Sequence, residues 1–264
     1  MRTNRTLARL QEGKAAFGCG LQQYRSTEVP RAFAAAGFDY VFIDMEHGAF
    51  DLETVQDMIG ASVAAGITPI VRVGELLYSL VSRLLDAGAQ GIIFPRVECP
   101  RTLETALSWT KFPPAGVRGY GVMLPLVDYE PLSFPEIVAH LNATTMTVVQ
   151  FETRTAIERA DELLSVPGFE VAMVGPADLS VSLGVPGQFD SPVLVDAVLA
   201  FIEKCVKHGI VPGIQTRTVA MARQWAERGM RFVGAGGEHS LLLAAAREAV
   251  AELHKSQAQA AAGS

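Results

Sequence analysis

Apolar runs and amphipathic stretches alternate along nearly the whole chain. Tyr40-Val41-Phe42-Ile43 is typical of the apolar runs: four β-favouring residues in a row, followed at once by Asp44. Such a run belongs in a sheet that is covered on both faces and expels charge to the strand ends. Runs of this kind predict strands at 16–21, 39–44, 68–73, 90–94, 146–151, 169–174, 210–214 and 231–234.

Helical patterns fill the intervals between these strands. They lie near 27–36, 51–65, 77–87, 100–110, 153–164, 192–208, 217–228 and 239–254. Strand–helix alternation repeated about eight times over roughly 250 residues is typical of the α/β class with a (β/α)8 TIM barrel, and a doubly wound open sheet is the main alternative. We expect a single domain over residues 1–254, whose C-terminal helix is used in oligomer packing, and an Ala/Gln/Ser-rich disordered tail over 255–264.

The interval 111–145 breaks the alternation. Prolines and glycines between Phe112 and Gly121 block both helix and sheet pairing, and a short helical pattern follows near 134–141. Loops this long in a compact domain are usually functional or cover a partner surface. The alternative is an ordered surface excursion without a role of its own.

Polar side chains follow most of the predicted strands. In a (β/α)8 barrel the active site is built at the carboxyl ends of the strands, so these residues are expected to meet at one rim. They are Asp44, Glu46 and His47 after the second strand, Arg72 in the third, Arg96 after the fourth, Gln150 and Glu152 at the fifth, Asp178 after the sixth, Gln215 after the seventh and Gly234–Gly237 after the eighth.

Charge and cysteine content narrow the function classes. Lys and Arg number 22 against 28 Asp and Glu, a formal charge of −6, which argues against a nucleic-acid or anionic-membrane partner. No apolar run reaches the ~20 residues that span a bilayer, and no signal-peptide pattern follows the N-terminal arginines. Cys19, Cys99 and Cys205 form no CxxC motif, which favours a reducing, cytoplasmic location and argues against a thiolate metal site.

Arg72 ends an otherwise apolar strand, so its guanidinium needs an anionic or carbonyl partner. One interpretation is that it binds a substrate carboxylate or a developing enolate. The alternative is an internal ion pair with Asp44 or Glu46.

Two carboxylates on neighbouring strands are candidates for a hard-cation site. Gln150 and Glu152 are two residues apart and therefore point the same way, and Asp178 opens the next strand-to-helix turn. Two carboxylates, with the remaining positions left to water and substrate, commonly hold Mg²⁺ or Mn²⁺. The alternative for Asp178 is a helix cap.

His47 is a candidate general base, because an unperturbed imidazole titrates near neutrality, although a structural role is the alternative.

Gly236 and Gly237 either bind a phosphate or allow close packing of the last strand and helix. The chain contains no HExxH, Walker-type GK[ST] or GxSxG motif, which argues against zincins, P-loop proteins and α/β-hydrolases.

Taken together, these motifs resemble the HpcH/HpaI aldolase family, the class II (metal-dependent) pyruvate and 2-oxo acid aldolases, over about residues 16–250. Six segments occur in the family's order: Ile43-Asp44-Met45-Glu46-His47, Val71-Arg72, Leu85-Asp86-Ala87-Gly88, Phe112-Pro113-Pro114-Ala115-Gly116-Val117-Arg118-Gly119, Gln150-Phe151-Glu152-Thr153 and Gly175-Pro176-Ala177-Asp178-Leu179-Ser180. The resemblance implies a (β/α)8 barrel assembled into a hexamer.

The resemblance also implies how substrate and metal are bound. Glu152 and Asp178 would be the ligands of Mg²⁺, Mn²⁺ or Co²⁺. Gln150, the backbone at Ala177 and Asp178 would lie at the 2-oxo acid, with Arg72 stabilising its enolate.

For proton transfer, the resemblance implies that His47 is the base and that Asp86 raises its basicity. Asp86 lies in a helical pattern away from the predicted rim, so it is expected to reach the site of a neighbouring subunit.

The implied reaction forms or cleaves 4-hydroxy-2-oxo acids from an aldehyde and a pyruvate- or hydroxypyruvate-type enolate, whose oxyanion a metal and a guanidinium would stabilise. The alternatives are an oxaloacetate-type decarboxylase using the same site and a non-catalytic oxo-acid-binding barrel. The chain departs from the family at the Gly20–Arg25 region, where a Trp is frequent, and at Gln215, where an apolar residue is common. Both departures favour a more polar acceptor or a hydroxylated donor.

Overall fold

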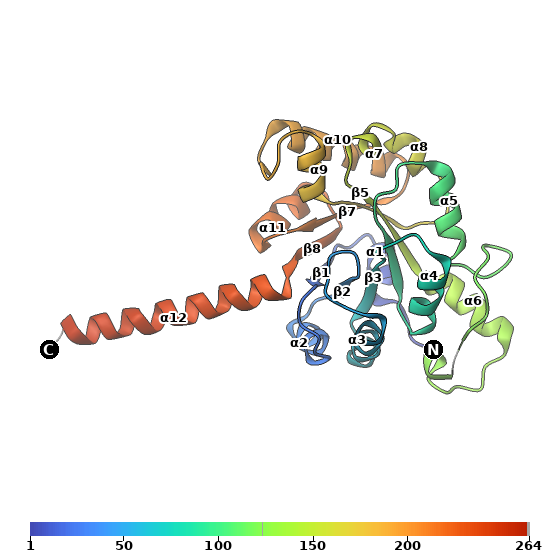
Figure 1. Cartoon of the computed structure of the whole chain (residues 1–264), viewed down its shortest axis with the longest axis horizontal. Coiled ribbons are helices and arrows are strands. Elements are labelled where there is room, and N and C mark those ends of the chain that lie inside the picture. Colours follow the sequence, from blue (N-terminus) through green and yellow to red (C-terminus); the bar gives the residue numbers. More distant parts are fainter. Residues whose placement is uncertain (123, 263–264) are drawn as a thin grey trace.

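The structure, a computed structural model, describes residues 1–122 and 124–262. Within them, parallel strands pair in chain order and close into an eight-stranded barrel (Figure 1), which confirms the (β/α)8 expectation and shows that the open-sheet alternative is wrong. The strands are β1 (Ala16–Leu21), β2 (Tyr40–Asp44), β3 (Thr68–Arg72), β4 (Gly91–Phe94), β5 (Met146–Phe151), β6 (Val171–Val174), β7 (Val211–Thr216) and β8 (Phe232–Gly237).

Helices surround the barrel and close one end of it. They are α1 (Arg5–Gln11), α2 (Glu28–Ala36), α3 (Leu52–Ala65), α4 (Tyr78–Asp86), α5 (Pro100–Ser108), α6 (Phe134–Thr144), α7 (Arg154–Glu158), α8 (Ala160–Leu164), α9 (Pro176–Ser182), α10 (Pro192–Lys207), α11 (Val219–Glu227) and α12 (Glu238–Ala262), with the 3-10 helix η1 (Leu124–Val127). The sequence pattern did not predict α1 or α9, because helices of seven residues are too short to show a clear period. The predicted helix 153–164 is interrupted at Arg159, whose ψ of 16° separates α7 from α8.

The alternation of side-chain direction along the strands explains why polar residues lie at the carboxyl-terminal rim above an apolar barrel interior. Residues two apart on a strand point to the same face. On β2, Tyr40 and Phe42 belong to the core inside the barrel, and Asp44 follows two residues later at the carboxyl end. On β3, Ile70 lies in the same core and Arg72 follows it. The apolar interior therefore supports a polar layer at the carboxyl-terminal rim.

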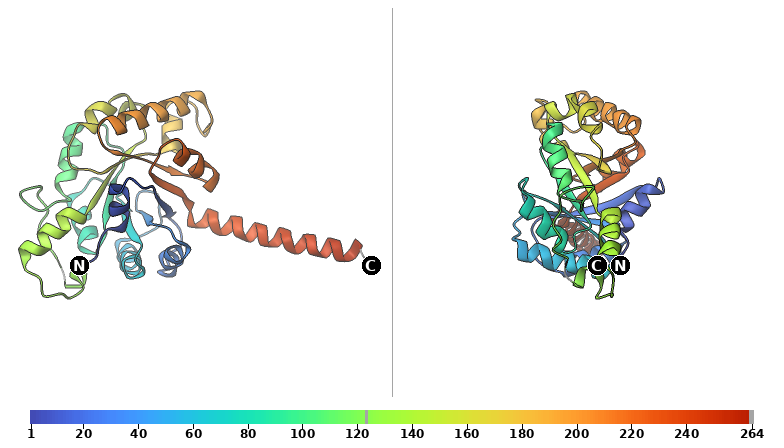
Figure 2. Two further views of the ribbon diagram at one scale, coloured as in Figure 1. Left: turned by 180° about the vertical axis from the view of Figure 1, so that it is seen from behind. Right: turned by 90° about the vertical axis from the view of Figure 1, so that its right-hand side faces the viewer.

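The opposite, amino-terminal end of the barrel is closed by the N-terminal segment. Figure 2 shows α1 lying across the barrel when the molecule is seen from behind. Asn4 caps α1 and its Nδ2 donates to the carbonyl oxygens of Gln90 and Thr144, both at 2.9 Å. In the long loop, α6 confirms the short helix expected near 134–141, and the Lys111 ammonium donates to the carbonyl of Asn142 at its end at 2.8 Å.

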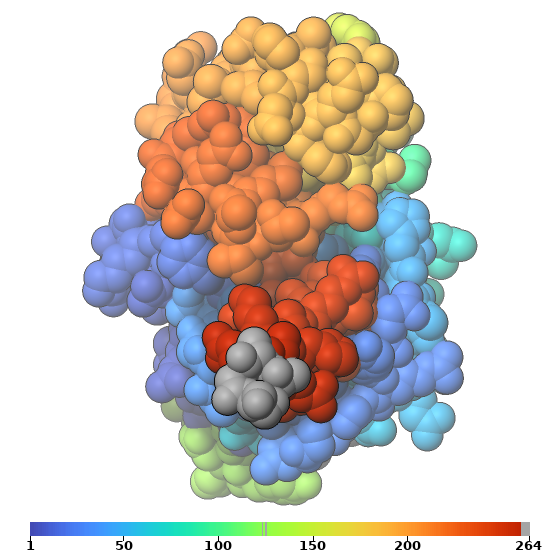
Figure 3. Space-filling model, turned by 90° about the vertical axis from the view of Figure 1, so that its left-hand side faces the viewer, coloured from blue at the N-terminus to red at the C-terminus, as the bar shows by residue number. Residues whose placement is uncertain are grey.

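The last helix, α12, leaves the barrel instead of packing along it (Figure 1), and Figure 3 views this helix end-on, in front of the rest of the molecule. Leu242, Leu243, Val250 and Leu253 are at least half exposed along it. Within the segment expected to form a tail, residues 255–262 continue α12, because Ala and Gln favour helix, and 263–264 lie outside the described residues. No helix among the described residues is long and apolar enough to cross a membrane.

Candidate active site

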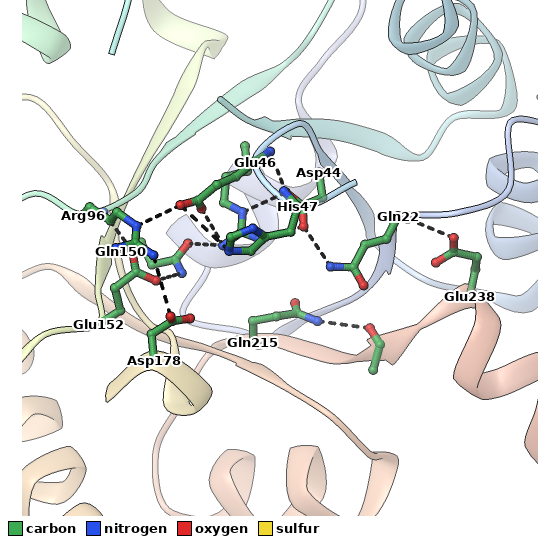
Figure 4. Close-up of polar contacts among 12 residues, drawn as sticks. Gln22, Asp44, Glu46, His47, Arg96, Gln150, Glu152, Asp178, Gln215 and Glu238 are labelled. Carbon is green, nitrogen blue, oxygen red and sulfur yellow. Dashed lines mark hydrogen bonds and ion pairs between the residues drawn. The ribbon is translucent and has the colours of Figure 1, made fainter. Parts of the chain in front are cut away.

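The structure brings the predicted rim residues together around a cavity of about 300 Å³. Figure 4 shows Glu46, Arg96, Gln150, Glu152 and Asp178 gathered on one side, His47 beside them, and Gln22 and Glu238 on the other side. The cavity is lined by side chains or backbone from the ends of seven strands and from the loops that follow them: Gly20, Gln22, Phe42, His47, Arg72, Gln150, Gly175–Asp178, Gln215–Arg217, Gly236, Gly237, His239 and Ser240.

Arg72 is held by a carboxylate at the centre of this rim. Asp44 is fully buried and accepts the Arg72 Nε at 3.0 Å and Nη2 at 2.7 Å, the Gln22 Nε2 at 2.8 Å, and the backbone N–H groups of Glu46 and His47 at 3.0 and 3.2 Å. Burial opposes the charge on Asp44, but the hydrogen bonds and charge of Arg72 lower its pKa below the ordinary value. The internal ion pair considered for Arg72 is therefore present.

The third nitrogen of the guanidinium faces the cavity side of the site. Arg72 Nη1 lies 3.4 Å from Gln150 Oε1 and 3.0 Å from Glu46 Oε2. The contact with Glu46 is an ion pair without good hydrogen-bond geometry, so that oxygen is a buried acceptor lacking a hydrogen-bond donor. Glu46 Oε1 accepts Arg96 Nε at 3.0 Å, and Glu46 thus bridges a buried and an exposed arginine.

Glu152 and Gln150 lie side by side, as their spacing on the strand predicts. Gln150 Nε2 donates to Glu152 Oε2, and the backbone N–H of Arg96 donates to Glu152 Oε1 at 2.9 Å. Gly175 makes room for the pair, since a Cβ there would lie 2.7 Å from Gln150 Nε2 and 2.9 Å from Glu152 Oε2. Burial, followed by the negative charge of Glu46, raises the pKa of Glu152.

Asp178 lies in the first turn of α9 and is half exposed at the cavity. The helix cap is Gly175, and it makes no side-chain capping bond, so the capping alternative for Asp178 is wrong. Its Oδ1 lies 3.8 Å from Arg96 Nη2, and its charge also contributes to the raised pKa of Glu152.

His47 lines the cavity with a half-exposed imidazole, whose Nε2 lies 4.0 Å from Glu46 Oε1. Asp86 is not beside it. Because α4 runs back from the rim, its last residue lies near the amino-terminal end of the barrel, where Asp86 accepts Arg118 Nη2 at 2.8 Å and lines a separate cavity of about 420 Å³. Asp86 cannot contact His47 of the same chain in this arrangement.

The side of the cavity formed by β7 and β8 is polar. Gln215 Nε2 donates to the carbonyl of Gly236 at 3.0 Å, and Arg217, His239 and Ser240 complete this wall. Gly236 has a φ of +78°, which favours glycine, and α12 then begins with an acid, Glu238, so the structure favours close packing over a phosphate site at Gly236–Gly237.

Three further residues organise the site. Arg96 was expected at the rim without a stated role, Gln22 was considered only as part of the Gly20–Arg25 region, and Glu238 was not predicted. Arg96 adopts a left-handed backbone (φ +54°), which is unusual for a residue with a side chain and directs its N–H to Glu152. Each contact joins segments far apart in the sequence, and no local pattern marks them.

Comparison with known proteins gives the family. A family model described as HpcH/HpaI aldolase/citrate lyase matches residues 25–245. A hydroxypyruvate/pyruvate aldolase of Paraburkholderia phytofirmans is 33% identical over 95% of this chain and 98% of its own length. A 4-hydroxy-2-oxo-heptane-1,7-dioate aldolase of Escherichia coli is 32% identical over 96% of this chain and 95% of its own.

Solved structures agree in fold over the whole barrel. The HpcH/HpaI aldolase from Desulfitobacterium hafniense superposes with a TM-score of 0.88 at 29% identity, covering 94% of this chain and 95% of that one. An HpcH/HpaI aldolase/citrate lyase family protein from Burkholderia cenocepacia gives the same TM-score at 32% identity, covering 96% of this chain and all of that one. The chain belongs to the HpcH/HpaI aldolase/citrate lyase family.

Proposed function

We propose that this protein is a divalent-metal-dependent aldolase that forms and cleaves 4-hydroxy-2-oxo acids. The observation that carries the proposal is an arginine and two carboxylates gathered at one rim: Arg72 and Asp178 line the cavity, and the buried Glu152 lies beside Gln150, which also contacts Arg72. The relatives named above act as aldolases on hydroxypyruvate or pyruvate and on a 4-hydroxy-2-oxo dioic acid.

The donor set fits a hard divalent cation at Glu152 and Asp178. Both groups are carboxylates, and Glu152 is buried beside further negative charge from Glu46, which raises its pKa; a cation would relieve that repulsion. Within the described chain no three His, Cys, Asp or Glu side chains form a metal cluster, so water and substrate would complete the coordination. We propose Mg²⁺, Mn²⁺ or Co²⁺, which when bound would supply Lewis-acid stabilisation of an oxyanion.

The protein's own groups would orient and activate the 2-oxo acid. Arg72, held at Nε and Nη2 by Asp44, would keep Nη1 directed at the enolate oxygen, and the Gln150 amide and the backbone at Ala177 would position the carboxylate and keto oxygens. A donor fixed before reaction stabilises charge as it develops. In cleavage, His47 would accept the proton of the 4-hydroxyl group, and in synthesis it would return it to the new alkoxide.

Metal-dependent exchange of the pyruvate methyl protons tests this function directly. In D₂O with Mn²⁺ or Mg²⁺, we expect loss of the methyl signal in proton NMR, because enolate formation releases a methyl proton to solvent. EDTA should stop the exchange, and restoring the metal should restart it. Absence of exchange with both pyruvate and hydroxypyruvate would contradict the proposal, and release of CO₂ from oxaloacetate far faster than aldol cleavage would favour the decarboxylase alternative.

The polar wall of the cavity supports a polar acceptor aldehyde. Gln215, Arg217 and His239 contribute hydrogen-bonding groups to this wall, and such groups can orient a polar aldehyde. We include hydroxypyruvate among the proposed donors for the same reason. The free cysteines Cys19, Cys99 and Cys205 fit the cytoplasmic location that we propose.

We further propose a homo-oligomer, of hexameric size, in which α12 packs on a neighbouring subunit. Its exposed Leu242, Leu243, Val250 and Leu253 need an apolar partner, which the helix does not find on its own barrel. In such an assembly Asp86 would reach the His47 of a neighbour, since the two are at opposite ends of one barrel.

Subunit complementation tests this shared site. His47→Ala and Asp86→Ala chains should each be nearly inactive, and co-expression of the two should restore about a quarter of wild-type activity, because half of random pairs are mixed and one of the two sites in each is intact. No recovery in co-expressed protein, or full activity of a monomer isolated by gel filtration, would show that Asp86 does not act across subunits.

A further inference from the structure

Glu238 joins the last strand of the barrel to the opposite side of the site. It follows β8 as the first residue of α12, and its side chain is only 2% exposed. Its Oε1 accepts three consecutive backbone N–H groups, from Gln22 at 2.9 Å, Gln23 at 2.5 Å and Tyr24 at 3.1 Å. Charge-assisted bonds from three main-chain donors fix the conformation of this turn.

The turn held by Glu238 carries a side chain that reaches the centre of the site. Gln22 Nε2 donates to Asp44 Oδ2 at 2.8 Å, and the same carboxylate binds the Arg72 guanidinium and the backbone N–H of His47. Hydrogen bonds therefore link the start of α12 to the Arg72 guanidinium and to the backbone of His47, the two residues that are proposed to act on the substrate; Figure 4 shows the Glu238, Gln22 and Asp44 members of this series.

The position of Glu238 is a costly one for stability. Its Oε2 is buried without a hydrogen-bond partner, and the nearest nitrogen of a basic side chain is His239 Nδ1 at 3.7 Å. An acid at the start of a helix interacts favourably with the helix dipole even when it is exposed. Burial of Glu238 adds a desolvation cost, and the interaction with the helix dipole would not need that burial. What the buried position adds is the contact with the backbone N–H groups of residues 22–24.

We propose that Glu238 is a positioning residue of the active site, which acts through Gln22 and Asp44 to orient Arg72 and the turn that carries His47. Glu238 does not line the cavity, so it has no contact of its own with substrate. The inference rests on the proposed function in one respect: Arg72 and His47 must be the groups whose placement limits the rate of reaction.

The test compares Glu238→Gln, Gln22→Ala and the double variant in the full-length protein. We expect each single variant to lower the maximal rate of Mn²⁺-dependent pyruvate methyl exchange by about 10–100-fold, the size of effect that a small misplacement of reacting groups produces. The KM for pyruvate and the Mn²⁺ Kd, measured by EPR titration, should stay within about twofold, because Glu152 and Asp178 lie on the other side of the cavity. The double variant should be no slower than the slower single variant, because the two residues act in series.

Glu248→Gln is the matched control, since it makes the same chemical change at an exposed position of the same helix. It should leave the rate unchanged. Rates within twofold of wild type in both single variants, or effects that multiply in the double variant, would overturn the positioning role. If Glu238→Gln does not fold, Glu238→Asp, whose shorter side chain withdraws the carboxylate from residues 22–24, takes its place and should show the same loss of rate. An inactive wild-type protein would instead overturn the proposed function.

Discussion

Glu152→Gln is expected to lower kcat/KM by at least ~10³-fold and to abolish divalent-metal binding, because a ligand that stabilises an oxyanion through a metal contributes several kcal/mol. The substitution keeps the size of the side chain, but its single amide oxygen can accept from only one of the two donors, Gln150 Nε2 and the Arg96 N–H. It removes the charge and one acceptor. Isothermal titration with Mn²⁺ and the methyl-exchange assay measure the two effects separately, and folding is checked by circular dichroism.

Glu170→Gln is the matched control for this change. Glu170 is another acid whose pKa is raised by burial, but it lies at the amino-terminal end of β6 and accepts the backbone N–H of Thr147 at 2.7 Å. Metal binding and turnover should remain, with at most a change in stability. Equal loss of metal affinity in both variants would indicate a general effect of neutralising buried acids, and retention of full affinity in Glu152→Gln would remove Glu152 from the proposed metal site.

The fold and the location of the site follow from local pattern. Period-two alternation places Asp44 above Tyr40 and Phe42 and places Arg72 above Ile70, and the parallel order of strands brings those ends to one rim. Both steps need only a few consecutive residues and a general rule of barrel folds, which is why the sequence sufficed for them.

The hydrogen bonds and ion pairs between the site residues could not be predicted in the same way. Glu238 contacts residues 22–24 across more than 200 positions, and Arg96 reaches Glu46 across 50. Such contacts depend on loop conformation, including the left-handed backbone of Arg96. Loops lack the hydrophobic periodicity from which helices and strands are predicted. Asp86 illustrates the limit of resemblance: its role was assigned by likeness, and the single chain places it at the far end of the barrel.

Arg72→Ala is expected to be both inactive and unstable. Arg72 is 6% exposed, and its loss leaves the buried Asp44 carboxylate without its cation, which costs about 3–5 kcal/mol and lowers the Tm by about 6–20 °C. Loss of the proposed enolate donor should lower kcat by about 10²–10³-fold. Differential scanning calorimetry and the exchange assay, with Mn²⁺ held constant, measure these effects. Arg72→Lys should recover part of the stability but little activity, because an ammonium cannot bind Asp44 in two places and still reach Gln150.

The pH dependence of stability separates a charge effect from a packing effect. In the wild type, Arg72 lowers the pKa of Asp44, so its contribution to stability is present above the unfolded pKa and is lost as the pH falls through the folded one. Without Arg72 the burial of Asp44 raises that pKa, and protonation at low pH relieves the penalty. The Tm deficit of Arg72→Ala should therefore narrow as the pH falls from 7 toward the pKa of Asp44.

Arg96→Ala provides the comparison that makes this result specific. Arg96 binds the same Glu46 at 3.0 Å, but its side chain is 60% exposed, so solvent screens the pair and its removal should cost no more than about 1 kcal/mol. If the Tm difference between Arg72→Ala and the wild type stays constant with pH, the loss of stability comes from lost packing against Phe42, whose ring lies 5.1 Å from the guanidinium. Equal losses in the Arg72 and Arg96 variants would contradict the central position given to Arg72, because the two differ mainly in burial and in the carboxylate that only Arg72 holds.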